Sequence, residues 1–147
     1  IKQSLNDFDA KENVLNCIKA AKWCCANKLY QQATTMLEEG LGTFLCCHYQ
    51  LDYRNKANRD AIFGCISIKT QNKDTEENKA NKELVEKILA DDSVWGNKAF
   101  VTILQKILEL RNDYNHAGFK KNPFSAQKVI ETIEELLDGI EEVLSEI

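Results

Sequence analysis

The sequence predicts an all-α domain, and three observations support this prediction. Apolar residues recur at spacings of three and four, the period of one helix face, while the alternation typical of strands is nearly missing. The 147 residues contain one proline and six glycines, so few positions interrupt a helix. A chain of this length can form a core that needs no disulfide or metal. We therefore expect residues 1–147 to form a single helical domain.

The apolar periodicity predicts about six helices, packed as a bundle of two long hairpins. We expect these helices at approximately residues 9–28, 30–51, 58–68, 75–90, 94–116 and 126–144. Residues that commonly cap helices stand at several expected starts, namely Asp7 or Asp9, Ser93 and Ser125. Gly118 stands where a left-handed residue commonly ends a helix.

Two of the expected helices have features that bear on packing. The helix over 94–116 has the broadest apolar surface, so we expect it at the centre of the core. Its apolar stripe comprises Phe100, Ile103, Ile107, Leu110 and Tyr114. The helix over 30–51 contains Gly40 and Gly42, each of which costs about 1 kcal/mol relative to alanine in a helix interior. These glycines either permit a close helix crossing or mark a kink.

The charge distribution excludes one class of protein and leaves another open. The net charge of −4 argues against a protein that coats nucleic acid nonspecifically. Residues 51–73 nevertheless carry a net charge of +3, and residues 126–147 carry −6. Basic segments of this kind are more often solvated helix faces, and we take that as the first interpretation. The alternative is that residues 51–73 contact RNA.

The six cysteines, at positions 17, 24, 25, 46, 47 and 65, form no C-x-x-C pair. Because His48 is the only imidazole near them, we expect no metal and no other cofactor, and we interpret the cysteines as reduced core residues. No apolar run approaches the ~18 residues of a membrane span, and no signal peptide is evident. We therefore expect a cytoplasmic protein with no membrane partner.

The stretch from Leu110 to Gly118 is the most informative for chemistry, because it places Arg111, Asn112, Asn115 and His116 at the end of the central helix. Asn112 and His116 are four residues apart and share a helix face, so the amide could orient the imidazole. Arg111 and His116 are five apart, which separates them by about 140° around the axis. Either the last turn is distorted, or a second copy of the helix completes the site, as in a two-fold dimer.

An arginine and a histidine suit metal-free cleavage of RNA. The guanidinium can hold two phosphate oxygens while the phosphate gains charge, and the imidazole can transfer protons near neutral pH. The competing interpretation is that both cations stabilise the negative end of the helix dipole, worth about 0.3–1 kcal/mol. That effect would accept any cation and does not explain the grouping of these four residues.

The segment Arg111-Asn-Asp-Tyr-Asn-His116 matches the R-x4–6-H motif of the HEPN superfamily, including the polar residue directly after the arginine. Its continuation, His116-Ala-Gly-Phe119, resembles the form found in CRISPR-associated CARF–HEPN proteins of type III systems. Residues 21–38 resemble the helical hairpin that opens the HEPN region of those proteins, whereas residues 52–98 resemble nothing in the family.

This resemblance implies a HEPN-like all-α domain that forms a homodimer and cuts single-stranded RNA without metal, as an antiviral defence endoribonuclease. Arg111 and His116 of both subunits would line one composite cleft, with Asn112 assisting and Asn115 nearby. Members of the family usually sense a cyclic oligoadenylate through an N-terminal CARF domain. Since this chain shows no such strand pattern, we expect it to be the C-terminal effector part of a longer protein.

Two other functions are compatible with the same residues. The first is a HEPN domain that dimerises or binds without catalysis. The second is a HEPN toxin that a nucleotidyltransferase partner neutralises. Both catalytic candidates, Arg111 and His116, are present in the sequence, which favours an active enzyme.

Overall fold

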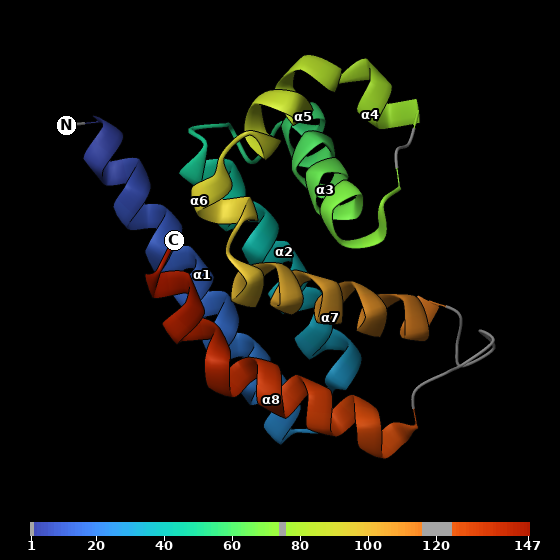
Figure 1. Ribbon diagram of the computed structural model, residues 1–147. Coiled ribbons are helices and arrows are strands. Elements are labelled where there is room, and N and C mark those ends of the chain that lie inside the picture. Colours follow the sequence, from blue (N-terminus) through green and yellow to red (C-terminus); the bar gives the residue numbers. More distant parts are fainter. Residues whose placement is uncertain (1, 74–75, 116–124) are drawn as a thin grey trace.

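The computed structural model describes the backbone of residues 2–73, 76–115 and 125–147, and the side chains of residues 12–73, 78–114 and 125–147. This part of the chain contains helices and no strand, so the predicted all-α class is confirmed (Figure 1). The helices are α1 (Lys2–Ala26), α2 (Tyr30–His48), α3 (Lys56–Gln71), α4 (Glu76–Ala80), α5 (Lys82–Leu89), α6 (Asp92–Trp95), α7 (Lys98–Asn115) and α8 (Ala126–Ser145). The described residues thus form eight helices, where the sequence predicted about six.

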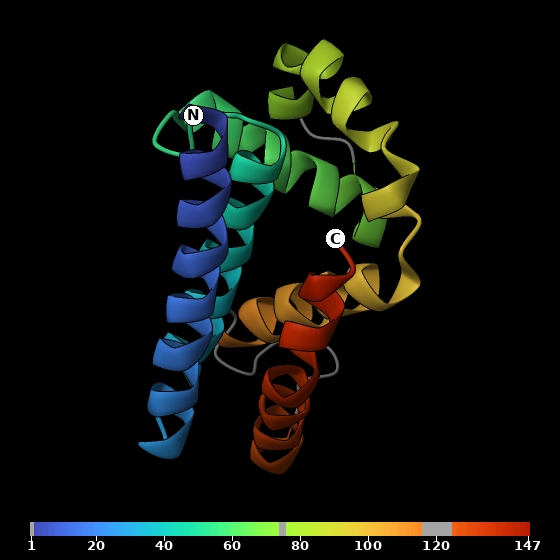
Figure 2. The same ribbon diagram turned by 90° about the vertical axis from the view of Figure 1, so that its left-hand side faces the viewer.

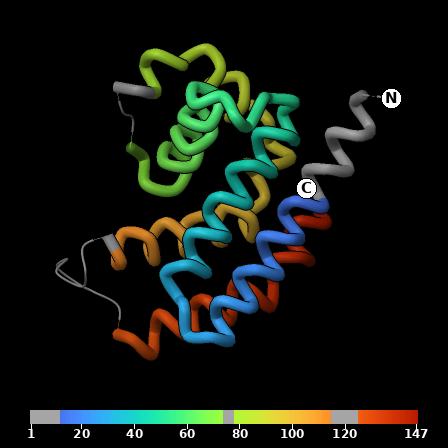
Figure 3. The backbone as a smooth tube through the Cα atoms, turned by 180° about the vertical axis from the view of Figure 1, so that it is seen from behind, coloured from blue at the N-terminus to red at the C-terminus, as the bar shows by residue number. Residues whose placement is uncertain are grey.

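Helices α1 and α2 form the first predicted hairpin and lie side by side, with α8 packed against α1 (Figure 3). Lys28 adopts a φ of 61° in the tight turn between them, and the Leu29 N–H donates to the Cys24 carbonyl at 2.8 Å. One face of α1 is buried, and its core residues are Val14, Ile18, Ala21 and Cys24. The prediction that α1 begins near Asp9, capped by Asp7 or Asp9, is wrong, because the helix already includes Lys2.

The glycines of α2 permit close helix packing. A Cβ on Gly40 would lie 2.7 Å from the Cβ of Cys17 on α1, and one on Gly42 would lie 2.7 Å from the ring of Phe63 on α3. Since α2 is one continuous helix through both positions, the choice between a close crossing and a kink is decided in favour of the crossing. Helix α2 therefore lies between α1 and α3 at short range.

Helices α3 to α6 form a compact group at one end of the α1–α2 hairpin (Figure 1). Asn55 caps α3 and accepts from the Asn58 N–H, and Asn72 ends the helix in the left-handed conformation. The single helix predicted over 75–90 is two helices, α4 and α5, because the chain leaves helical geometry at Asn81.

The predicted fifth helix is also divided in two. Asp91 rather than Ser93 caps the short helix α6, and the Asp91 carboxylate accepts from the Ser93 N–H. A second start follows at Asn97, whose side chain accepts from the Phe100 N–H and begins α7. The caps at Asp91 and Asn97 therefore begin two separate helices, although the continuous apolar pattern predicted one.

Helix α7 crosses α2 between α3 and α8, at the centre of the molecule (Figures 1 and 2). Its central position confirms the prediction made from its apolar stripe, since Phe100, Ile107 and Leu110 are buried. Helix α8 begins at the predicted cap, where the Ser125 hydroxyl accepts from the Lys128 N–H at 3.1 Å. Helices α7 and α8 pack together as the second predicted hairpin.

None of the helices in the described ranges combines the length and the apolar character that crossing a membrane requires.

Candidate functional site

Arg111 lies near the C-terminal end of α7, where that helix packs against α2. Its Nη1 donates a hydrogen bond to Oε1 of Glu38 on α2, at 2.6 Å. The Arg111 side chain is 38% exposed, whereas the Glu38 side chain is only 13% exposed. The carboxylate is therefore the more buried partner of the pair, and the guanidinium the more exposed one.

The hydrogen bonding of Arg111 is incomplete. Its Nε is buried and has no hydrogen-bond partner among the described residues. An arginine carries five N–H donors in a planar fork, and the bond to Glu38 uses one of them. Because the Nε–H is buried, the donors that remain for a further anionic partner are those of the two Nη groups.

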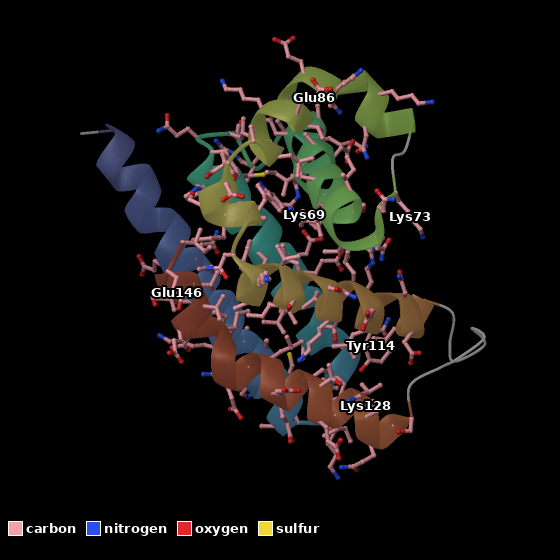
Figure 4. The ribbon with its side chains drawn as sticks, in the orientation of Figure 1. Lys69, Lys73, Glu86, Tyr114, Lys128 and Glu146 are labelled. Carbon is pink, nitrogen blue, oxygen red and sulfur yellow. The ribbon has the colours of Figure 1, made fainter. Side chains whose placement is uncertain are left out.

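The neighbouring turn of α7 adds a second polar group to the same contact. The Tyr114 hydroxyl is buried beside Thr34 of α2 and has no hydrogen bond of good geometry to a described residue, because the Thr34 hydroxyl donates to the Tyr30 carbonyl at 3.0 Å. Burial raises the pKa of Tyr114 to about 12, although the neighbouring Thr34 hydroxyl lowers it in part. Figure 4 shows Tyr114 near the C-terminal end of α7 and Lys128 near the beginning of α8. The phenol is therefore neutral at physiological pH.

The other predicted site residues are described only in part. Asn112 follows Arg111 on α7 and is half-buried, and Asp113 beside it is buried. Asn115 belongs to α7, but its side chain lies outside the described residues. His116, Gly118 and the expected loop after them also lie outside the described residues. The convergence of Arg111 and His116 therefore stays a prediction.

The basic segment over 51–73 is largely neutralised by its own neighbours. Arg54 pairs with Asp52 at 3.3 Å, Lys56 pairs with Asp60 at 2.5 Å, and Arg59 pairs with Glu39 of α2. Two lysines remain, Lys69 on α3 and Lys73 just after it, and neither forms an ion pair with a described residue (Figure 4). Contact between this segment and RNA would accordingly depend on these two side chains.

Other polar clusters in the described ranges are explained by structure. Asp91 caps α6, accepts from the Tyr49 hydroxyl at 3.1 Å and lies 3.8 Å from the Nε2 of His48, which ties α2 to α6. A shallow groove of about 430 Å³ lies between the N-terminal half of α7 and the C-terminal half of α8. Two of its lining residues, Lys106 and Glu135, form an ion pair at 3.5 Å.

The cysteines of the described residues are free thiols, and Cys24, Cys46 and Cys65 are buried in the core. Burial raises the pKa of Cys46 to about 11 and that of Cys65 to about 12, so neither is a reactive thiolate at neutral pH. Within the ranges that the structure describes, no three metal-binding side chains gather in one place.

Glu38 and Thr34 were not predicted from the sequence, although a signal for them was present. The buried residues Thr34, Leu41 and Leu45 follow one line along α2 at helical spacing, and Glu38 stands on the same line. A carboxylate inside an otherwise buried helix face predicts a paired cation on the neighbouring element.

The chain was compared with models of known protein families, with curated proteins and with solved structures, and none of them matches it significantly.

Proposed function

We propose that this chain is a metal-independent endoribonuclease domain of the HEPN type, acting on single-stranded RNA. The observation that carries the proposal is the state of Arg111. The nearly buried Glu38 carboxylate pairs with Nη1 of this residue, while the Arg111 side chain as a whole remains 38% exposed. The same arginine begins the R-x4-H segment that resembles the HEPN motif.

The proposed reaction needs only the groups of the protein and of the RNA. The 2′-hydroxyl of a nucleotide attacks the adjacent phosphorus, and the bond from phosphorus to the 5′-oxygen of the next nucleotide breaks. His116 accepts the proton of the attacking hydroxyl, and an acid in the site, such as the second His116 of a dimer, donates a proton to the leaving oxygen. Arg111 stabilises the charge on the phosphate oxygens, and Asn112 and Asn115 assist. The products are a 2′,3′-cyclic phosphate and a free 5′-hydroxyl.

A homodimer is part of this proposal, because Arg111 and His116 are five residues apart and a single straight helix separates them by about 140°. A two-fold axis near the end of α7 would bring Arg111 and His116 of one subunit into the same cleft as Arg111 and His116 of the other. By resemblance, the domain would serve CRISPR-associated antiviral defence in the cytoplasm, controlled by a sensor of cyclic oligoadenylate outside this chain.

The test is cleavage of a labelled single-stranded RNA in EDTA by the wild-type chain, His116→Ala and Arg111→Lys. The lysine retains a charge for Glu38 but lacks the planar fork that binds a phosphate at two points. We expect both variants to lose at least about 100-fold in kcat, the usual cost of removing a donor from such a site. Arg59→Lys is the matched control, because it changes the other arginine that α2 holds. Equal cleavage by all four proteins would reject the proposal.

A second candidate is a HEPN domain that binds or dimerises without cutting. One observation favours it: the Arg111–Glu38 pair links α2 to α7 within a single chain, so the arginine has a structural partner even without substrate. This candidate predicts that the wild-type chain binds RNA or dimerises while the RNA stays intact.

A further inference from the structure

Helix α2 presents two successive glutamates, and each pairs with an arginine from a different helix. Glu38 pairs with Arg111 of α7, and Glu39 pairs with Arg59 of α3. The two pairs are built in opposite ways. In the first the carboxylate is the buried partner, with exposures of 13% for Glu38 and 38% for Arg111. In the second the arginine is buried, with exposures of 21% for Arg59 and 58% for Glu39.

The surroundings of Arg59 explain its orientation. Its Nη1 donates to the Thr43 hydroxyl at 3.0 Å, and its guanidinium lies over the Phe63 ring at 5.6 Å from the centroid. The remaining charge is balanced by Glu39, which faces solvent. Arg59 therefore has the contacts of a structural arginine that joins α2 to α3.

Arg111 has the opposite character, because the group behind it is a nearly buried carboxylate. Burying a carboxylate is unfavourable unless a cation pairs with it, so Glu38 holds the guanidinium at one fixed place. The charge-assisted bond to Nη1 is short, at 2.6 Å, and Nη2 has no hydrogen bond to a described residue. Nη1 is fixed toward α2 and Nε is buried, so a phosphate would meet the remaining Nη hydrogens.

We propose that Glu38 is a positioning residue of the candidate site, which orients the Arg111 guanidinium so that its exposed donors meet the phosphate of the RNA. This inference rests on the proposed ribonuclease function. A guanidinium on a long flexible side chain must lose several rotations before it can hold a phosphate at two points. A carboxylate that fixes the guanidinium beforehand removes that cost from the reaction, as outer-shell partners do for metal ligands and catalytic groups.

The test compares Glu38→Gln with Glu39→Gln in the whole 147-residue chain. The two substitutions remove the same charge from adjacent positions of one helix, so they are matched in chemistry and in sequence context. We expect Glu38→Gln to lower kcat for single-stranded RNA by about 10- to 100-fold, with KM changed by less than about threefold. Glu39→Gln should cut RNA at the wild-type rate.

A second variant and a second measurement guard against loss of folding. Glu38→Asp retains the charge but places the carboxylate one methylene further from Arg111. It should fold and still lower kcat, by about 10-fold. Arginine side-chain NMR of the ¹⁵N-labelled chain reports the anchor without any reaction. The Nη groups of Arg111 should rotate slowly in the wild type and in Glu39→Gln, and fast in Glu38→Gln.

The outcomes separate this inference from the proposed function. A wild-type chain that leaves RNA intact overturns the ribonuclease proposal and the positioning role together. A wild-type chain that cuts RNA, with Glu38→Gln and Glu38→Asp cutting equally fast, overturns the positioning role alone. Fast rotation of the Arg111 Nη groups in the wild type would also overturn it, whatever the rate of cleavage.

Discussion

Helix α2 contacts α7 along one face and α3 along another, and the two contacts differ in how completely their polar groups are satisfied. At the α3 contact, Arg59 has a carboxylate, a hydroxyl and an aromatic ring as partners. At the α7 contact, the Arg111 Nε and the Tyr114 hydroxyl are buried without hydrogen bonds to described residues. Buried polar groups are usually satisfied, and exceptions concentrate at functional sites. The α3 contact thus has the character of a structural joint, and the α7 contact that of a site.

The largest expected effect separates the packing of α7 from its polar end. Ile107 is buried in the same helix as Arg111, four residues earlier. Ile107→Ala should lower the free energy of unfolding by about 2–5 kcal/mol, because it removes buried methyl groups and leaves a cavity. Urea denaturation measures this loss. RNA cleavage per folded molecule should be unchanged, and a large loss of that specific activity would contradict the division between core and site.

The next largest effect is the loss of stability when each of the two arginines is replaced by alanine. Arg111→Ala leaves the nearly buried Glu38 carboxylate without its cation and should cost about 2 kcal/mol of stability. Arg59→Ala leaves a carboxylate that water can hydrate, and should cost about 1 kcal/mol through lost stacking and hydrogen bonding. Denaturation of both variants at equal ionic strength gives the comparison.

A double substitution checks the cause of that difference. If the buried carboxylate is responsible, Glu38→Ala should recover part of the stability that Arg111→Ala loses. Additive losses in the double variant would instead show that the two side chains act independently.

Tyr114 provides a pH-dependent probe of the α7 contact. Its folded pKa is raised from 10 to about 12 by burial, so the folded protein binds this proton more tightly than the unfolded chain. The resulting contribution to stability is complete below about pH 10 and is lost as the pH rises through about 12. Burial also raises the pKa of Tyr49, so absorbance titration should show two late-ionising phenols. Tyr114→Phe should remove the one that ionises near pH 12.

The same substitution tests the unsatisfied hydroxyl. At neutral pH, Tyr114→Phe should be neutral or stabilise the protein by up to about 1 kcal/mol, because it removes a buried hydroxyl that has no hydrogen bond. A clear destabilisation would mean that this hydroxyl has a partner in solution, which would make the two contacts of α2 more alike.

The smallest expected effect belongs to Glu39. Its side chain is 58% exposed, so the ion pair with Arg59 is screened by water. Glu39→Gln should change stability by less than about 1 kcal/mol, and the change should shrink further in high salt. Thermal melts at two salt concentrations measure it, and a loss as large as that of Arg111→Ala would remove the distinction between the two pairs.

Features of the fold that depend on local pattern were predictable from the sequence. The apolar stripe of α7 and the Ser125 cap of α8 are found as predicted, because periodicity and capping act within a few residues. Helix boundaries were less predictable where two possible caps compete. Asp91 and Ser93 are both good caps, and only the structure shows that Ser93 donates to Asp91 instead of capping a helix itself.

The residues of the candidate site likewise include some that local sequence predicts and some that it does not. The motif residues Arg111 and Asn112 were selected from one continuous segment of sequence. Glu38 was not, because its pairing with Arg111 depends on how α2 and α7 cross, and no spacing rule connects residues so far apart. The opposite burial of Glu38 and Glu39, adjacent in sequence, likewise arises only from the helices that pack on either side of α2.

The Glu38–Arg111 hydrogen bond joins two residues that are 73 positions apart in the chain. During synthesis, α2 leaves the ribosome long before α7, and such a long-range contact forms only when most of the chain is in place. In a nascent, truncated or partly unfolded chain, one of the two residues is missing or the two are not held together. Under the proposed mechanism, destructive activity toward RNA is thereby reserved for molecules that have finished folding.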